Sequence, residues 1–140
     1  MPSGDFDVTT VITALASQLS SNISGLRTYA TTPFTVDPPA VVFHIEEILY
    51  DQAMSNSAHD LVLLAIVCTQ FGSDRGELQL RKFMAPTGTN SVSAAVDSDW
   101  TLGGNVAWSN VKRMRQVQIL TLGEAQFYSA SFEIEIGTGK

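Results

Sequence analysis

Hydrophobic residues near the start of the chain recur at the spacing of an amphipathic helix. Val8, Ile12, Leu15 and Leu19 fall at i, i+4, i+7 and i+11, with polar residues between them. Such a stripe covers one face of a helix, and Asp7 stands where its carboxylate can cap the free amides of the first turn. The pattern predicts a helix that begins at Val8 and buries this stripe.

Two strands are predicted next. Residues 26–31, "LRTYAT", predict a short strand, and residues 40–48, "AVVFHIEEI", predict a longer one. In the longer strand Val41, Phe43 and Ile45 point to one face, while the residues between them point to the other. We expect the first face to be buried and the second to be partly polar.

The remaining strands lie further along the chain. Residues 61–68 are apolar at every position, which is typical of a central strand covered on both faces. Residues 106–120 and 127–136 alternate polar and apolar positions, and the segment 121–125 between them predicts the turn of a long β-hairpin. The last strand is expected to direct Phe132, Ile134 and Ile136 inward, and Ser131, Glu133 and Glu135 outward.

Two helices are predicted between the central strand and the hairpin. The stretch "GSDRGELQLRKFMAP" has a cap at Ser73, a pair at i,i+4 between Glu77 and Arg81, and apolar residues at helical spacing. Ser91 then caps a shorter helix that ends at "DSD", before the glycines at 103–104. We interpret these glycines as a turn that needs positive φ.

The order of elements predicts an α+β fold: a mainly antiparallel sheet with helices packed on one face, ending in a long β-hairpin. At 140 residues the chain has the length of one domain, so we expect a single domain over residues 1–140. Charged residues make up only 16% of the sequence, well below the usual quarter. A surface with few charges costs less to desolvate, which favours burial against neighbouring subunits.

The net charge of −6 is unevenly spread. Residues 1–60 carry seven acidic residues against one basic residue, whereas residues 61–140 carry seven of each. Nucleic-acid affinity comes mostly from neutralising phosphates, and the one short basic run, at 112–115, supplies little of it. The sequence therefore disfavours specific nucleic-acid binding.

The sequence also bears on the compartment. A single cysteine, Cys68, allows no internal disulfide and favours a reducing setting. The acidic start "MPSGDFDV" lacks the basic and apolar regions of a signal peptide. The longest apolar run, eight residues at 61–68, is far shorter than a membrane span. We therefore expect neither export nor membrane insertion.

Residues suited to catalysis or metal binding are scarce. His44 and His59 have no partners at metal-ligand spacing, and we interpret His44 as a solvated or subunit-facing partner of Glu46 on the same strand face. Cys68 lies in the most apolar run, where a thiol behaves as a small hydrophobe. Trp100 is expected to anchor the short helix to the core. The sequence predicts no enzyme activity, cofactor or metal.

The segment "SVSAAVDSDWTLGGNV" at 91–106 is the most diagnostic part of the chain. It follows "PPAVVF" at the start of a strand, the polar connection "YDQAMSNSAHD" and the helical "SDRGELQLRKFM", and it precedes the closing strand "FYSASFEIEI". In this order, from about Val8 to Ile136, these segments resemble the tail terminator family of long-tailed bacteriophages, especially the form seen in phages of actinobacteria.

This resemblance implies a structural role in the virion. Tail terminators form a hexameric ring at the head-proximal end of the tail. The ring caps the tail tube, stops its polymerisation and joins it to the head-side connector or stopper protein. The implied partners are thus copies of the chain itself, the tail tube protein and the connector, with assembly in the host cytoplasm. Genome DNA would pass through the lumen without specific binding, and an acidic lumen would repel it.

Candidate contact residues lie in two places. The polar connection before the central strand is long, and Tyr50, Met54 and His59 within it are candidates for contacts outside the subunit; a surface loop without partners is the alternative. The basic run at 112–115 could pair with acidic residues of an adjacent subunit; a solvated strand face and pairing across strands within the chain are the alternatives. The residues concerned are Lys112, Arg113 and Arg115, with Glu133 and Glu135 as acidic partners.

Two other classes of protein stay open. One is another phage neck protein, such as a head completion or stopper protein, which would join the connector and not end the tube. The other is a small monomeric binding domain, or an enzyme whose site has an unfamiliar pattern. The oligomeric state of the purified protein separates the ring-forming proteins from the monomeric ones.

Overall fold

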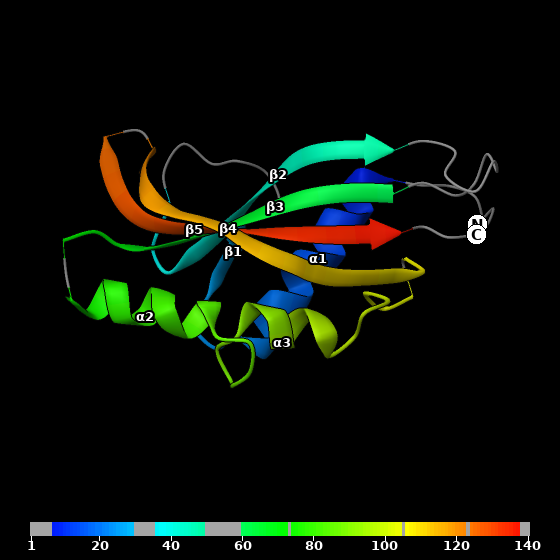
Figure 1. The fold of residues 1–140 in the computed structure, drawn as a ribbon, viewed down its shortest axis with the longest axis horizontal. Coiled ribbons are helices and arrows are strands. Elements are labelled where there is room, and N and C mark those ends of the chain that lie inside the picture. Colours follow the sequence, from blue (N-terminus) through cyan, green and yellow to red (C-terminus); the bar gives the residue numbers. More distant parts are fainter. Residues whose placement is uncertain are drawn as a thin grey trace.

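The computed structural model describes residues 7–29, 36–49, 60–72, 74–104, 106–122 and 124–137. These residues form three helices and five strands in the order α1, β1, β2, β3, α2, α3, β4, β5. Figure 1 shows a twisted sheet with the helices gathered on one side of it. The predicted α+β fold, with a β-hairpin at its end, is confirmed.

Helix α1 spans Val8–Asn22, and its apolar stripe packs into the core, with Ile12, Leu15 and Leu19 buried and Val8 partly buried. Asp7 is its N-cap. The Asp7 carboxylate accepts a hydrogen bond from the backbone N–H of Thr9 at 3.0 Å and another from the hydroxyl of Thr10 at 3.1 Å. The stripe and the cap predicted from the sequence are therefore both confirmed.

The sheet has the strand order β1-β2-β3-β5-β4. The strands are β1 Arg27–Tyr29, β2 Ala40–Leu49, β3 Asp60–Gln70, β4 Trp108–Leu122 and β5 Ala125–Gly137. β1 pairs with β2 in parallel, and the other neighbours pair antiparallel. β3 is the middle strand, as predicted, and β4 forms a sheet edge of 15 residues.

The remaining helices are α2 Asp74–Met84 and α3 Val92–Asp97. In α2, Arg81 Nη2 lies 2.9 Å from Glu77 Oε2, as the i,i+4 spacing predicts. In α3, the hydroxyl of Ser91 accepts from the backbone N–H of Ala94 at 3.0 Å, so the predicted cap is confirmed. Ser73, the predicted cap of α2, lies outside the described residues. No helix in the described part of the chain is long and apolar enough to cross a bilayer.

The core lies between the sheet and the helices, in one continuous cluster of buried residues. Because side chains alternate along a strand, the β3 residues at 61, 63, 65 and 67 face the helices, and so do Phe132, Ile134 and Ile136 of β5. Burial of apolar surface is the main favourable term in folding, so this alternation decides which face of the sheet the helices cover. The inward direction predicted for the last strand is confirmed.

Two expectations about the sheet faces are wrong. β3 is not covered on both faces along its whole length, because the helices pack on one face and leave Val62, Leu64 and Ile66 half-buried on the other. In β2, Ile45 is exposed although Val41 is buried. Ile45 pairs with the buried Leu63 and so points to the helix side as predicted, but it is 42% exposed there. The regular alternation of β2 ends after Ile45, where the register against β3 shifts, which is the signature of a β-bulge.

Candidate functional site

Charged residues gather on the sheet face that the helices leave uncovered. Three of them, Glu46 in β2 and Lys112 and Arg115 in β4, are extra residues at shifts of the strand register. Such bulges re-aim a side chain, and here Lys112 and Arg115 contact the acids of β5 while Glu46 contacts Arg115. The resulting charged cluster consists of Glu46, Lys112, Arg113, Arg115, Glu133 and Glu135.

The predicted basic and acidic residues of the hairpin pair within the chain. Lys112 Nζ lies 3.3 Å from Glu135 Oε2. Arg113 Nε lies 3.6 Å from Glu133 Oε2. Of the alternatives that the sequence leaves open, the structure therefore has the cross-strand pairing between β4 and β5, as expected for opposite charges on neighbouring strands.

Arg115 links β4 to β2 across the two strands between them. Its Nη1 lies 2.9 Å from Glu46 Oε1, and its Nε lies 3.7 Å from Glu133 Oε1. The Glu133 side chain is only 13% exposed, but the other two side chains are more than a third exposed. Ion pairs this open to water contribute roughly 0–1 kcal/mol each, so the charged cluster makes a polar surface more than it stabilises the fold.

The charged cluster borders a shallow hollow of about 250 Å³, which Glu47 and Val62 also line. The sequence identifies the five hairpin members of the cluster but not Glu46, whose place depends on the bulge in β2. The pair of adjacent acids at 46–47, which breaks the alternation of the strand, is the only sequence signal for it. The candidates Tyr50, Met54 and His59 lie outside the described residues.

Strand β4 is an exposed edge with an apolar side. The cross-strand partners of Met114, Val117 and Ile119 are residues of β5 that lie in the core or pack against it, so these three side chains point to the helix side of the sheet. Val117 is nevertheless 51% exposed and Ile119 is 54% exposed. In the described residues β4 pairs only with β5, which leaves its outer backbone groups able to accept another strand.

The turn after α3 is held by hydrogen bonds to Asp99. One carboxylate oxygen accepts from the Thr101 hydroxyl at 2.8 Å, and the other accepts from the backbone N–H of Gly103 at 2.9 Å. These two hydrogen bonds, the Thr101 one first, hold the pKa of Asp99 below its ordinary value, so the carboxylate stays ionised. Gly103 and Gly104 both have positive φ, which confirms the turn predicted from the glycines.

Trp100 does not anchor the short helix to the core, contrary to expectation. Its side chain lies at the surface and the residue is 54% exposed. The backbone explains this, because the turn bonded to Asp99 fixes the chain on one side of Trp100, and the Ser109 hydroxyl donates to the Trp100 carbonyl oxygen at 2.8 Å. The core contact is made instead by Leu102, which is buried with φ of 51°.

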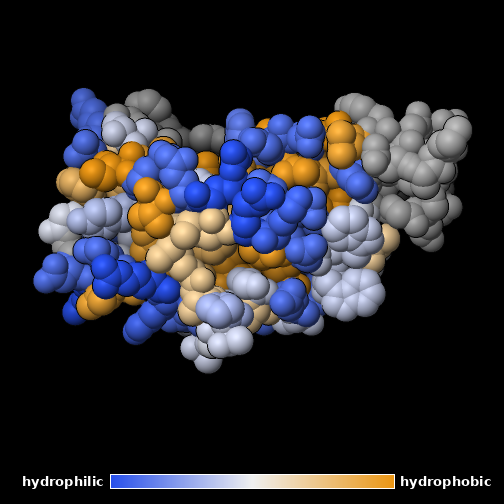
Figure 2. Space-filling model, in the orientation of Figure 1, coloured by the Kyte–Doolittle hydropathy of each residue, from blue (hydrophilic) through white to orange (hydrophobic). Residues whose placement is uncertain are grey.

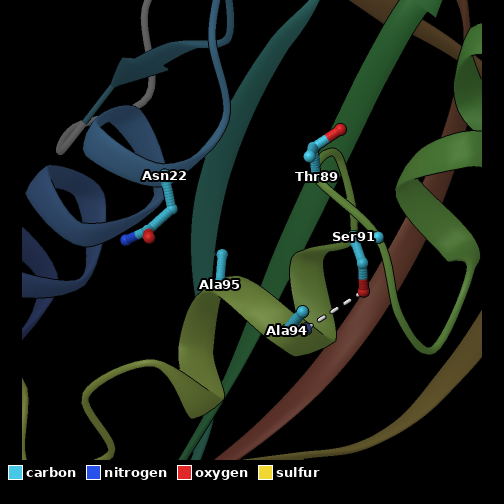
Figure 3. Close-up of a pocket in the computed structure, with 6 residues that line it drawn as sticks. Asn22, Thr89, Ser91, Ala94 and Ala95 are labelled. Atoms are coloured by element: carbon cyan, nitrogen blue, oxygen red, sulfur yellow. Dashed lines mark hydrogen bonds between the residues drawn. The ribbon is translucent and has the colours of Figure 1, made fainter.

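A second hollow lies between the end of α1 and the start of α3 (Figure 3). Its volume is about 250 Å³, and its polar side chains include Asn22 and Ser91. The Ser91 hydroxyl donates to the Ala85 carbonyl oxygen and caps α3, and the Asn22 amide donates to the Gln18 carbonyl oxygen at 2.8 Å. These groups are therefore used by the fold itself.

The remaining chemically capable residues are separate from one another. Cys68 is buried, and burial raises the pKa of its thiol from 9.0 to about 11. His44 is exposed on the uncovered face of β2. Within the ranges that the structure describes, His, Cys, Asp and Glu form no group of three or more that could hold a metal ion.

Comparisons with known proteins add no relative. No family model matches the sequence. A search of curated proteins likewise finds no match.

Proposed function

We propose that this chain is a structural subunit that assembles into a ring, and that the ring is the tail terminator of a long-tailed phage. In this proposal the ring caps the tail tube at its head-proximal end, stops tube polymerisation and joins the tube to the connector. The observation that carries the proposal is the long exposed edge strand β4 with its uncovered apolar side chains.

An exposed edge of this kind is costly for a protein that stays alone. Native sheets protect their edges with charges, bulges or covering segments, because an open edge pairs with other chains. The first half of β4 has such protection, with two bulges and the basic run at 112–115. The segment 116–121 has no charged residue, and it carries Val117 and Ile119. This half of β4 fits a surface that a neighbouring subunit covers.

The composition and the sequence resemblance support the same conclusion. A low fraction of charged residues reduces the cost of burying a large surface between subunits. Contacts between unlike surfaces of identical subunits produce closed rings when the rotation between neighbours closes. The resemblance of the chain to tail terminators, centred on "SVSAAVDSDWTLGGNV", is the reason for proposing a tail terminator ring and not another ring.

The proposal is tested first by the mass of the purified protein and by electron microscopy of the assemblies. We expect wild-type protein to form rings, with or without added tube protein. Val117→Lys should prevent ring formation, because it places a charge in the buried contact. Gln118→Lys, a change at a residue that is also exposed but on the other side of the same strand, is the matched control. A wild-type protein that stays monomeric in both conditions would refute the ring.

A phage that lacks the gene separates the terminator from other neck proteins. Without a terminator the tail tube is not capped and its polymerisation does not stop, so we expect tails of abnormal and variable length that are not joined to capsids. Tails of uniform, normal length that fail to join capsids would favour a head completion or stopper protein instead.

A further inference from the structure

The turn after α3 presents a tryptophan on a rigid and acidic support. We call residues 97–104 the acidic turn. It carries Asp97 and Asp99, and its sequence contains no basic residue. The Asp99 carboxylate binds Thr101 and Gly103, and the Gln18 amide binds the Asp99 carbonyl oxygen at 3.0 Å, so the backbone on either side of Trp100 is fixed before any partner arrives.

A tryptophan held in this way is suited to protein recognition. Large aromatic side chains bury much surface for few rotatable bonds, and tryptophan is enriched among the residues that dominate binding energy. Fixing the backbone in advance lowers the entropy that binding would cost. Trp100 is therefore suited to anchor the acidic turn to another protein surface, and we call its side chain the anchor.

Helix α2 carries a groove with the complementary properties. The groove has a volume of about 410 Å³, and it is lined by Arg75, Leu78, Gln79, Lys82 and Asn90. Leu78 is the apolar residue of this lining and is 55% exposed. Neither Arg75 nor Lys82 has an ion pair among the described residues. We call this surface the α2 groove.

The acidic turn and the α2 groove lie toward opposite ends of the molecule. In Figure 1, α2 lies at the left, whereas the chain after α3 turns at the right before it enters β4. Figure 2 shows hydrophobic surface mixed with strongly hydrophilic surface at the left end, where α2 and the tip of the hairpin lie. The anchor and the groove therefore cannot meet within one copy.

We propose that Trp100 of one copy docks in the α2 groove of the next copy, head to tail. The indole packs on Leu78, and the acidic turn lies against Arg75 and Lys82. A cation beside an aromatic ring adds a further attraction. The contact joins unlike surfaces, so an open chain of copies keeps a free anchor at one end and a free groove at the other until the ring closes. The inference rests on the proposed ring function and adds a second contact between its subunits, besides the one proposed for the edge strand β4.

Substitutions on the two surfaces test this contact by sedimentation velocity. Trp100→Ala and Leu78→Glu should each weaken association by roughly 30-fold, the effect expected of a central interface residue. Ile45→Ala, which changes an exposed apolar residue outside both surfaces, should leave association unchanged. Both side chains are exposed, so we expect the melting temperatures of Trp100→Ala and Leu78→Glu to equal that of the wild type, which would show that both variants fold.

A mixture of the two variants gives the sharpest test. Trp100→Ala retains the groove and Leu78→Glu retains the anchor, so an equimolar mixture should form dimers through one intact contact and no rings. Asp97→Lys and Lys82→Glu should each weaken association, and together they should recover at least about tenfold of the loss, since the charges match again.

The outcomes distinguish this inference from the ring itself. If wild-type protein forms rings and Trp100→Ala forms them equally well, the docking contact is wrong while the ring stands. If wild-type protein stays monomeric with and without tube protein, both fail. Recovery of association by the exchanged charges, with dimers in the mixture, would support the head-to-tail contact.

Discussion

The hydrogen bonds of Gln18 predict the most informative single substitution. Its side-chain Nε2 lies 3.0 Å from the Ala95 carbonyl oxygen, 3.2 Å from that of Val96 and 3.0 Å from that of Asp99. The last carbonyls of a helix have no partner within the helix, and here α1 provides a donor for them. Gln18→Glu keeps the shape of the side chain but replaces the donor with a negatively charged acceptor.

The cost of Gln18→Glu can be worked out from these contacts. An amide has two N–H donors, so at most two good hydrogen bonds are lost at any time, at roughly 1 kcal/mol each. A negative charge at the C-terminal end of a helix adds about 0.3–1 kcal/mol. The free energy of unfolding should therefore fall by about 2–3 kcal/mol, which corresponds to roughly 6–10 °C in melting temperature for a domain of this size.

Urea unfolding at two pH values provides the assay. At pH 7 the variant should show the full loss, with Thr13→Glu, an added charge on the exposed face of α1, as the matched control. The introduced carboxyl faces carbonyl oxygens, so its folded-state pKa should rise, and part of the loss should be recovered as pH falls below its folded pKa. A Gln18→Glu variant within about 0.5 kcal/mol of the control at pH 7 would refute the bonding role of Gln18.

Three further predictions follow from the fold. Gly76→Ala should lower the free energy of unfolding, measured with urea, by roughly 1–3 kcal/mol, because the alanine Cβ would overlap the Gln70 carbonyl oxygen. Alanine favours a helix more than glycine does, so a variant that is more stable than the wild type would contradict this packing. Arg115→Met should cost less than about 1 kcal/mol at low salt and should make stability less sensitive to NaCl, which salt titration measures. Burial raises the pKa of the Cys68 thiol from 9.0 to about 11, so the contribution of the thiol to the free energy of unfolding is complete below pH 9.0 and is lost as pH rises toward about 11. Cys68→Val should therefore reduce the loss of stability seen in unfolding curves measured across this alkaline range.

The elements were predictable because their signals are local. The stripe of α1, the caps at Asp7 and Ser91 and the alternation of β5 each depend on residues within a few positions of one another. Backbone geometry gives helices and strands different side-chain periods, so such patterns can be read without knowing what they pack against. The predicted fold class follows from the order of these elements.

The charged cluster was predictable only in part. The hairpin places Lys112 to Arg115 opposite Glu133 and Glu135, and two adjacent antiparallel strands can be aligned from the sequence. Glu46 enters the cluster from β2, two strands away from β4, and only because the register shifts at that residue. A bulge is a property of the pair of strands, so neither strand shows it alone.

The exposure of Trp100 could not be predicted from the sequence either. Its residue type favours burial, yet the turn bonded to Asp99 directs the chain so that Leu102 packs inward and Trp100 faces solvent. The apolar character of a side chain indicates how much its burial would stabilise the fold, but not whether the backbone conformation directs that side chain into the core.

The sequence by itself determined where helices and strands form, which residues cap them, and which side of each regular strand is apolar, since short-range geometry and periodicity govern all of these. Only the tertiary structure decided that β4 lies at the edge, that bulges bring Glu46 to Arg115, and that Trp100 is exposed. The physical reason is that strand order, register and coverage arise from the packing of distant segments, and a local pattern contains no information about which distant surface will cover it.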